Sequence, residues 1–158
     1  MQDTSNYQRE REKAHEFYQK IGGVYSPVLE DKIHFNAEGF NHLIYKGRRK
    51  ERPKTEQMMK FKLLPRAKTI LEKSTTYQEY DEGLTTVERK KHKKRVQEAV
   101  VTRYWGFVAI EGNSRMKVVV RQAGNGQKHF WSVIPAWSSN QYKGIKLTSR
   151  AKGDLAEE

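Results

Sequence analysis

Histidine and two dense groups of basic residues are the parts of this sequence best suited to chemistry. The five histidines are His15, His34, His42, His92 and His129. Histidine titrates near neutral pH and can act as a general acid or base, while arginine and lysine hold phosphate groups. RNA cleavage needs little more, because the substrate supplies its own nucleophile, the 2′-hydroxyl. These residue types therefore permit RNA cleavage without a metal ion.

His42 is the first choice as an acid or base, because it lies on a short predicted helix one turn before the first basic group. Arg48 or Arg49 in that group, and Arg121 on a predicted strand, could hold the scissile phosphate through paired donors. A structural role for His42 and a plain surface position for Arg121 are the alternatives. The candidate catalytic residues are His42, Arg48, Arg121 and Ser132.

His129 and Ser132 lie three residues apart on the last predicted strand. Side chains at that spacing point to opposite faces of a regular strand. The two can serve one site only if a bulge intervenes.

The basic residues are concentrated in the middle of the chain. The whole sequence has 31 Lys and Arg, 19 Asp and Glu and a net charge of +12, and 18 of the basic residues lie between positions 46 and 103. A polyanion such as RNA neutralises such density and releases counterions. A solvated helix face or a loop is the alternative reading. The predicted nucleic-acid-binding residues are Lys46, Arg49, Lys50, Arg52, Lys91, Lys94, Arg95, Lys128 and Trp131.

Aromatic side chains in the C-terminal half could stack on unpaired bases or lie in the core of the protein. They are Tyr104, Trp105, Phe130 and Trp131.

Several other functions lack their motifs. The chain has no cysteine, its histidines lack metal-binding spacing, no glycine-rich phosphate loop is present, and no GxSxG motif surrounds Ser132. We expect no metal and no cofactor. No apolar run reaches the roughly 20 residues of a membrane helix, so we expect no membrane partner and a cytoplasmic location.

The N-terminal half has helical patterns. Apolar residues from Tyr7 to Ile21 follow helical spacing up to Gly22-Gly23, and Asn36 is placed to cap the helix AEGFNHLIYK. A longer helix is predicted over residues 53–73, interrupted near Pro65.

The C-terminal half has strand patterns. Apolar, β-branched and aromatic residues dominate Thr102–Ile110, Arg115–Gln122 and Lys128–Ala136, which are separated by turn-forming sequences. Val118 and Val120 alternate with Val119 and Arg121, which predicts one buried and one exposed face.

We therefore predict an α+β fold, with N-terminal helices packed on one face of an antiparallel, four-stranded C-terminal sheet. Residues 1–27 are predicted as an N-terminal helix and lead-in, residues 28–137 as the main domain, and residues 138–158 as a mobile tail. A basic insertion is expected at 76–98, with a helical run from Val87 to Ala99.

The order of these patterns resembles the barnase, colicin-nuclease and RelE-like (BECR) superfamily, particularly its phage and mobile-element members. The similarity covers residues 28–137 and rests on IHFNAEGFNHLIYKGRRKERPK, KFKLLPRAKTIL, WGFVAIEG, MKVVVRQ and KHFWSVIP.

This resemblance implies a metal-independent endoribonuclease fold that binds RNA on the open face of its sheet. His42 then matches a polar helix position, residues 48–52 a cationic segment and Ser132 a small hydroxyl residue on the last strand, with Arg121 a looser match. No glutamate stands out as a general base.

Three functions remain open at this point. The first is an endoribonuclease, of toxin or mobile-element type, that forms a 2′,3′-cyclic phosphate. The second is a non-catalytic, basic nucleic-acid-binding module. The third is a structural protein that binds an acidic partner. For the first and the third function, the expected protein partner is an antitoxin or immunity protein.

Overall fold

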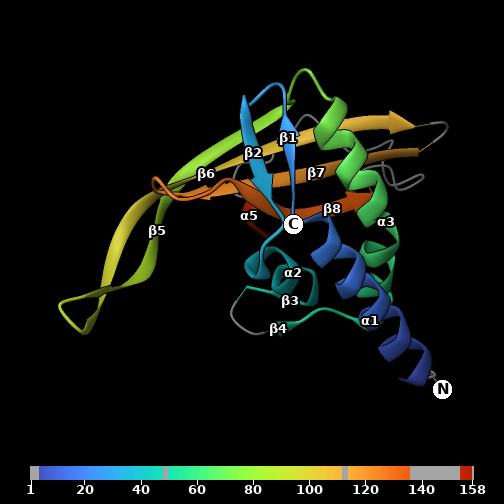
Figure 1. Ribbon diagram of the computed structural model, residues 1–158, viewed down its shortest axis with the longest axis horizontal. Helices are drawn as coiled ribbons and strands as arrows, with labels where there is room; N and C mark the ends of the chain where they lie inside the picture. Colours follow the sequence, from blue (N-terminus) through green and yellow to red (C-terminus); the bar gives the residue numbers. More distant parts are fainter. Residues whose placement is uncertain (1–3, 48–49, 112–113, 136–153, 158) are drawn as a thin grey trace.

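A layer of helices is built by the N-terminal half of the chain. The computed structural model describes residues 4–47, 50–111, 114–135 and 154–157 (Figure 1). The main helices are α1 (Thr4–Ile21), α2 (Ala37–Ile44) and α3 (Lys54–Lys73). Gly22 ends α1 with a φ of 63°, and Asn36 Oδ1 accepts the backbone N–H of Gly39 at 3.0 Å. Both predicted helix boundaries are confirmed, whereas α3 runs through Pro65 without the predicted interruption.

The second layer is a mixed, mostly antiparallel sheet with the order β1-β2-β8-β7-β6-β5. Its strands are β1 (Gly23–Ser26), β2 (Asp31–His34), β5 (Glu79–Lys91), β6 (Lys94–Glu111), β7 (Ser114–Ala123) and β8 (His129–Pro135). All neighbours pair antiparallel except β2 and β8. A separate hairpin joins β3 (Tyr45–Lys46) to β4 (Lys50–Glu51). The predicted α+β class is therefore confirmed.

The predicted number of four strands is wrong, because the sheet has six. β1 and β2 are four residues each, too short for a clear alternation of apolar and polar residues. β5 has polar residues on both faces, so no hydrophobic pattern marks it as a strand.

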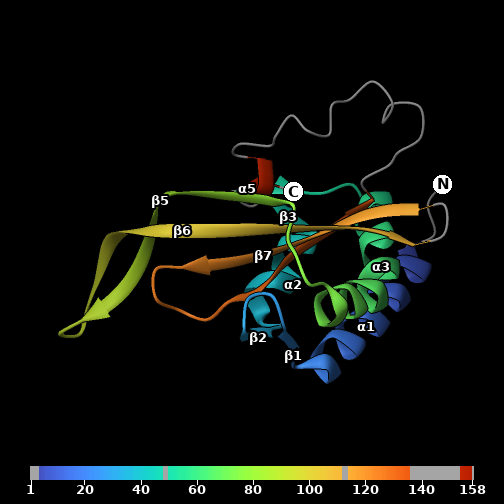
Figure 2. The ribbon, with the colours of Figure 1, turned by 90° about the horizontal axis from the view of Figure 1, so that it is seen from above.

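The predicted helical run from Val87 to Ala99 is also wrong. Residues 79–91 and 94–111 form one long hairpin, with Lys91 paired to Lys94 beside its turn. Its outer part projects from the body of the molecule (Figures 1 and 2). The run of basic residues in this segment has no apolar period, so it does not distinguish a helix from a strand, but the β-branched residues Thr85, Thr86, Val87, Val96, Val100 and Val101 favour a strand.

The core lies between the helices and one face of the sheet. Phe107, Val118, Val120 and Phe130 of the sheet are fully buried in the same cluster as Leu64 of α3. Aromatic side chains of α1 and α2 join them, including Tyr18 and Phe40, whose rings lie 5.3 Å apart. The predicted burial of Val118 and Val120 on one face is confirmed.

The opposite face of the sheet carries a short C-terminal helix. α5 (Asp154–Glu157) buries Leu155 against Tyr104 and Val119, and Ala156 packs beside them. Of the predicted mobile tail 138–158, most lies outside the described residues, but α5 itself packs on the sheet. The face expected to be open is therefore partly covered.

Gly39 permits α2 to pack directly on β8. A Cβ atom at this position would overlap the carbonyl oxygen of Phe130 and crowd the hydroxyl of Tyr18. We expect Gly39→Ala to lower the free energy of unfolding by about 2 kcal/mol or more, as overpacking does. Urea denaturation should show a lower midpoint with an unchanged slope.

Gly83→Ala in β5 is the matched control, because a Cβ at Gly83 would meet nothing within 4 Å. Equal losses of stability in both variants would contradict close packing at Gly39.

Candidate functional site

A β-bulge in β8 shapes the centre of the candidate site. Val119 pairs with Ser132, Val120 with Phe130 and Arg121 with His129, so Trp131 is the extra residue. Because the bulge shifts the register by one, His129 and Ser132 pair with positions 121 and 119, which share a face of β7. A bulge was the condition under which His129 and Ser132 could serve one site, and β8 contains that bulge.

Arg121 joins the groups of this site. Its Nη1 lies 3.1 Å from Glu38 Oε2 and 3.4 Å from His129 Nε2, and its Nε lies 3.4 Å from the hydroxyl of Tyr104. Its guanidinium carbon stands 4.8 Å from the centre of the Trp131 ring. The side chain is 13% exposed. A planar cation is thus held between a carboxylate, an imidazole and an aromatic ring.

Glu38 is a functional candidate that the sequence reasoning missed. It lies in the first turn of α2, and its side chain is 67% exposed. It stands four residues before His42, so the two share one face of the helix. The spacing between Glu38 and His42 could have indicated Glu38 as a candidate. Its contact with Arg121 could not be predicted in this way, because the two residues lie 83 positions apart in the sequence.

His129 is a buried, neutral imidazole. Its Nδ1 lies 2.9 Å from the carbonyl oxygen of Phe130, which can only accept, so Nδ1 carries the hydrogen and Nε2 faces Arg121. Burial lowers the pKa of His129; the bond to Phe130 opposes this shift, and the charge of Arg121 adds to it. An anion bound at Arg121 would therefore favour protonation of Nε2.

His42 is also buried and neutral. Its ring stacks on Trp131 with the centroids 3.9 Å apart, and its Nε2 lies 3.1 Å from Nη2 of Arg52. Arginine only donates, so this nitrogen accepts. Burial, followed by the positive charges of Arg52, Lys60 and Arg121, lowers the pKa of His42 to about 3. In this environment His42 stacks on Trp131 and stays neutral at neutral pH, so it is not an imidazolium that could act as a general acid.

A family comparison covers this region. The model of the large polyvalent protein-associated domain 3 (LPD3) family matches residues 5–130, well over half of the 158 residues. The chain belongs to this family. No curated protein and no solved structure matches the chain. The matched part of this LPD3 domain contains Glu38, Arg121 and His129 and ends one residue before Trp131.

Ser132, predicted as a catalytic residue, lies in the interior of the LPD3 domain. Its hydroxyl is bonded to Nζ of Lys60 at 3.1 Å, and the same ammonium group donates to the carbonyl oxygen of Val133 at 3.1 Å. Both side chains are fully buried. Lys60 thus links α3 to β8, and Ser132 takes part in that link.

The first predicted basic group is divided by the structure. Lys46 and Lys50 are exposed and pair across the β3–β4 hairpin, whereas Arg48 and Arg49 lie outside the described residues. Arg52 is 3% exposed and bonds to the carbonyl oxygen of His42 and to Glu56. It therefore lies inside the domain and not on the surface expected of a basic run.

The remaining predicted RNA contacts lie far apart. Lys128 is bonded to Asp31 at 2.9 Å, and this hydrogen bond holds the pKa of Asp31 below its ordinary value. The other predicted contacts, Lys91, Lys94 and Arg95, are exposed at the outer end of the β5–β6 hairpin. The structure does not bring them together with Arg121.

The four aromatic candidates divide between the two faces of the sheet. Trp105 and Phe130 lie in the core beneath the helices, while Tyr104 and Trp131 lie on the opposite face with α5. The indole N–H of Trp131 donates to the carbonyl oxygen of Ala156 at 3.0 Å. Base stacking on Trp131 would have to compete with these contacts.

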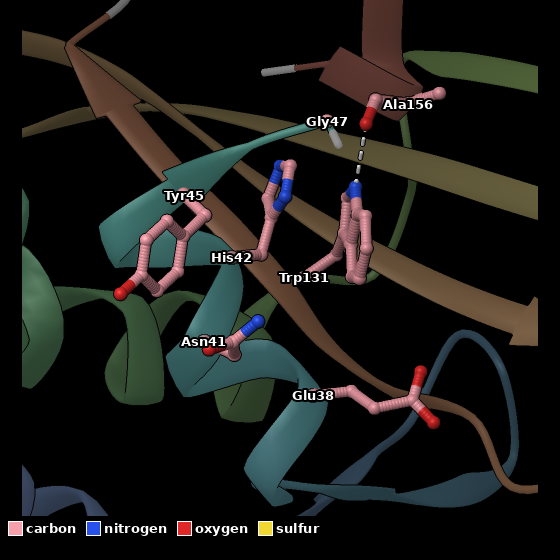
Figure 3. A pocket seen from close by; sticks show the side chains of 7 residues that line it. All are labelled: Glu38, Asn41, His42, Tyr45, Gly47, Trp131 and Ala156. Atoms are coloured by element: carbon pink, nitrogen blue, oxygen red, sulfur yellow. Dashed lines mark hydrogen bonds between the residues drawn. The ribbon is translucent and has the colours of Figure 1, made fainter. Parts of the chain in front are cut away.

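A pocket of about 190 Å³ opens between α2, Trp131 and α5 (Figure 3). It is smaller than the roughly 300–1,000 Å³ of pockets that enclose drug-sized ligands. Its lining residues are Glu38, Asn41, His42, Tyr45, Gly47, Trp131 and Ala156. The pocket therefore shares Glu38 and Trp131 with the Arg121 cluster.

Among the residues that the structure describes, no three His, Asp or Glu side chains are grouped so as to hold a metal ion. None of the helices there combines the length and apolar character needed to span a membrane.

Proposed function

We propose that this LPD3 domain is a metal-independent endoribonuclease, with Glu38, Arg121 and His129 as its reacting groups. The observation that supports this most directly is the position of Arg121, within 3.4 Å of both a carboxylate and an imidazole. A carboxylate, an imidazole and a guanidinium can serve as the base, the acid and the phosphate-binding group of cleavage through a 2′-hydroxyl. The earlier resemblance to the barnase-like superfamily points the same way and stays a prediction.

In the proposed reaction, the guanidinium of Arg121 binds the scissile phosphate and takes up the charge that develops on it. The carboxylate of Glu38 accepts the proton of the 2′-hydroxyl, whose oxygen then attacks phosphorus. The bond from phosphorus to the 5′-oxygen breaks, leaving a 2′,3′-cyclic phosphate and a 5′-hydroxyl.

His129 supplies the proton for the leaving 5′-oxygen. Burial and Arg121 keep the imidazole neutral without a ligand. A phosphate on Arg121 offsets the positive charge that opposes protonation, so RNA binding raises the pKa of His129 and loads Nε2 with a proton. The acid is thus charged in the complex in which it is needed.

The test is incubation of the purified protein with single-stranded and structured RNA in excess EDTA, followed by end-group analysis. We expect fragments that end in 2′,3′-cyclic phosphate. RNA with 2′-deoxyribose at the cleaved nucleotide should stay intact. Cleavage of that deoxy substrate, or no cleavage of any RNA, would contradict the proposal.

A nucleic-acid-binding module without catalysis is the second candidate, favoured by the exposed lysines at the end of the β5–β6 hairpin. It would retain RNA in a salt-dependent way and yield no cyclic phosphate.

A further inference from the structure

The outer part of the β5–β6 hairpin extends beyond the rest of the sheet. β7 pairs with β6 only from Thr102 onward, whereas β5 continues to pair with β6 as far as Lys91 and Lys94. We call residues 84–101 the basic ribbon. Its eight residue pairs, 84–91 with 94–101, give it a length of about 26 Å at roughly 3.3 Å per residue. Figures 1 and 2 show it standing clear of the helices.

The end of the basic ribbon carries a dense positive charge. Lys90 is paired with Arg95, and Lys91 with Lys94. Like charges directly opposite each other in a sheet destabilise the pairing. Among the described ion pairs, Arg95 meets Glu88 at 3.7 Å, but both side chains are exposed, so this pair contributes little.

The turn of the ribbon is strained as well. His92 and Lys93 have φ angles of 51° and 67°, which places both in the left-handed region. Two-residue turns of this kind favour Asn-Gly, because other side chains raise their energy. The chain thus places His92 and Lys93 where Asn-Gly would be more stable, and a ligand that binds the lysines at this end accounts for that choice.

The ribbon lies at a defined distance from the Arg121 cluster. Tyr104 pairs with Arg121, and Lys94 lies ten residues before Tyr104 on the same strand. Ten residues of strand span at most about 33 Å. One turn of a B-form double helix covers about 34–36 Å and holds roughly ten base pairs, and an A-form RNA duplex of the same length holds slightly more.

We propose that the basic ribbon is a second RNA-binding surface, which holds the phosphate backbone of a helical flank about ten nucleotides from the cleaved bond. The inference rests on the proposed function in taking RNA as the ligand, and it names the substrate class: RNA with a long, base-paired flank. Lysine binds phosphate as a point charge, so the ribbon recognises the backbone and not the base sequence.

The test measures binding of RNA whose cleaved nucleotide carries 2′-deoxyribose, with helical flanks of 4 to 20 base pairs on either side. For the wild type, affinity should rise about 10-fold or more once one flank passes roughly ten base pairs, as added phosphate contacts predict. The ribbon variant is K90Q, K91Q, K93Q and K94Q combined. It should lose this rise, and its salt slope on long RNA should fall by up to about 4.

Two further variants make the result specific. The charge control replaces four exposed basic residues on α1 and α3 and combines R9Q, K13Q, K20Q and K62Q. It should keep the rise in affinity with flank length. A shortened ribbon, with residues 86–99 replaced by Asn-Gly, should bind long and short RNA equally.

The inference is overturned if the wild type binds all flank lengths equally, or if the charge control loses as much affinity as the ribbon variant. An acidic protein would then be the partner to examine. This assay needs no cleavage, so failure of the proposed function, seen as missing cyclic phosphate, is distinguishable from failure of the ribbon.

Discussion

Replacing Arg121 by alanine is expected to reduce the rate of RNA cleavage by about 10²–10³-fold, the usual effect of removing one donor to a developing oxyanion. The guanidinium lies within 3.4 Å of both Glu38 and His129, so no other described cation is as well placed to take up the charge of the phosphorane. Single-turnover kinetics at saturating RNA should show the loss in the chemical step. RNA binding should change far less, because the proposed contacts between the basic ribbon and the flank do not depend on Arg121.

Two variants show whether this loss is specific. Arg121→Lys keeps the charge but not the planar pair of donors, and we expect an intermediate rate. Arg103→Ala, next to Tyr104 on β6, removes a more exposed arginine that meets Glu82 at 3.9 Å and should leave cleavage unchanged. Thermal melting checks that Arg121→Ala is folded. If the folded variant cleaves RNA at the wild-type rate, the reacting groups lie elsewhere.

The second large effect is expected in the acid stability of the protein. His42 has a pKa of about 3 in the folded protein, against about 6.5 in the unfolded chain. Between these values the unfolded chain binds a proton that the folded protein does not, so the free energy of unfolding falls as the pH falls. Well below pH 6.5 the loss approaches about 1.4 kcal/mol per pH unit. From pH 6.5 to 4.5 it amounts to about 2 kcal/mol.

Urea denaturation at several pH values measures this dependence. His42→Gln should be less stable than the wild type at pH 7, since it loses the stacking on Trp131, but its stability should fall less steeply below pH 6.5. Some slope remains, because the pKa of His129 is lowered too. An unchanged slope in His42→Gln would show that another group controls acid stability.

The same substitution separates the two roles considered for His42. As a positioning residue, it should affect cleavage through Trp131 and Arg121 without moving the pH profile of the reaction. His129→Ala, by contrast, should remove the limb of the profile that depends on the general acid. A loss of that limb in His42→Gln would support the role first predicted for His42.

Local features of the fold were predictable from the sequence. The end of α1 at Gly22, the cap of α2 at Asn36 and the alternation of Val118 and Val120 each depend on residues within one or two turns of the chain. The basic ribbon was not predictable from the sequence. A hairpin that extends into solvent buries neither of its faces, so its residues show no apolar period.

The candidate site was predictable only in part. Arg121 was identified from its place on a strand, but its partner Glu38 lies 83 residues away. The bulge that turns Trp131 toward His42 depends on the pairing of two complete strands. Single-sequence patterns carry no signal for such contacts.

The sequence by itself determined the residue types available for chemistry, the concentration of positive charge in the middle of the chain and the general α+β order of elements. Only the tertiary structure decided which groups meet and in which protonation state. A histidine in water is partly protonated near neutral pH, whereas His42 beneath Trp131 and Arg52 is neutral, because burial removes the solvent that stabilises a charged imidazole. Burial and long-range pairing are properties of the folded chain, and they assign His42 to support and Arg121 to the proposed chemistry.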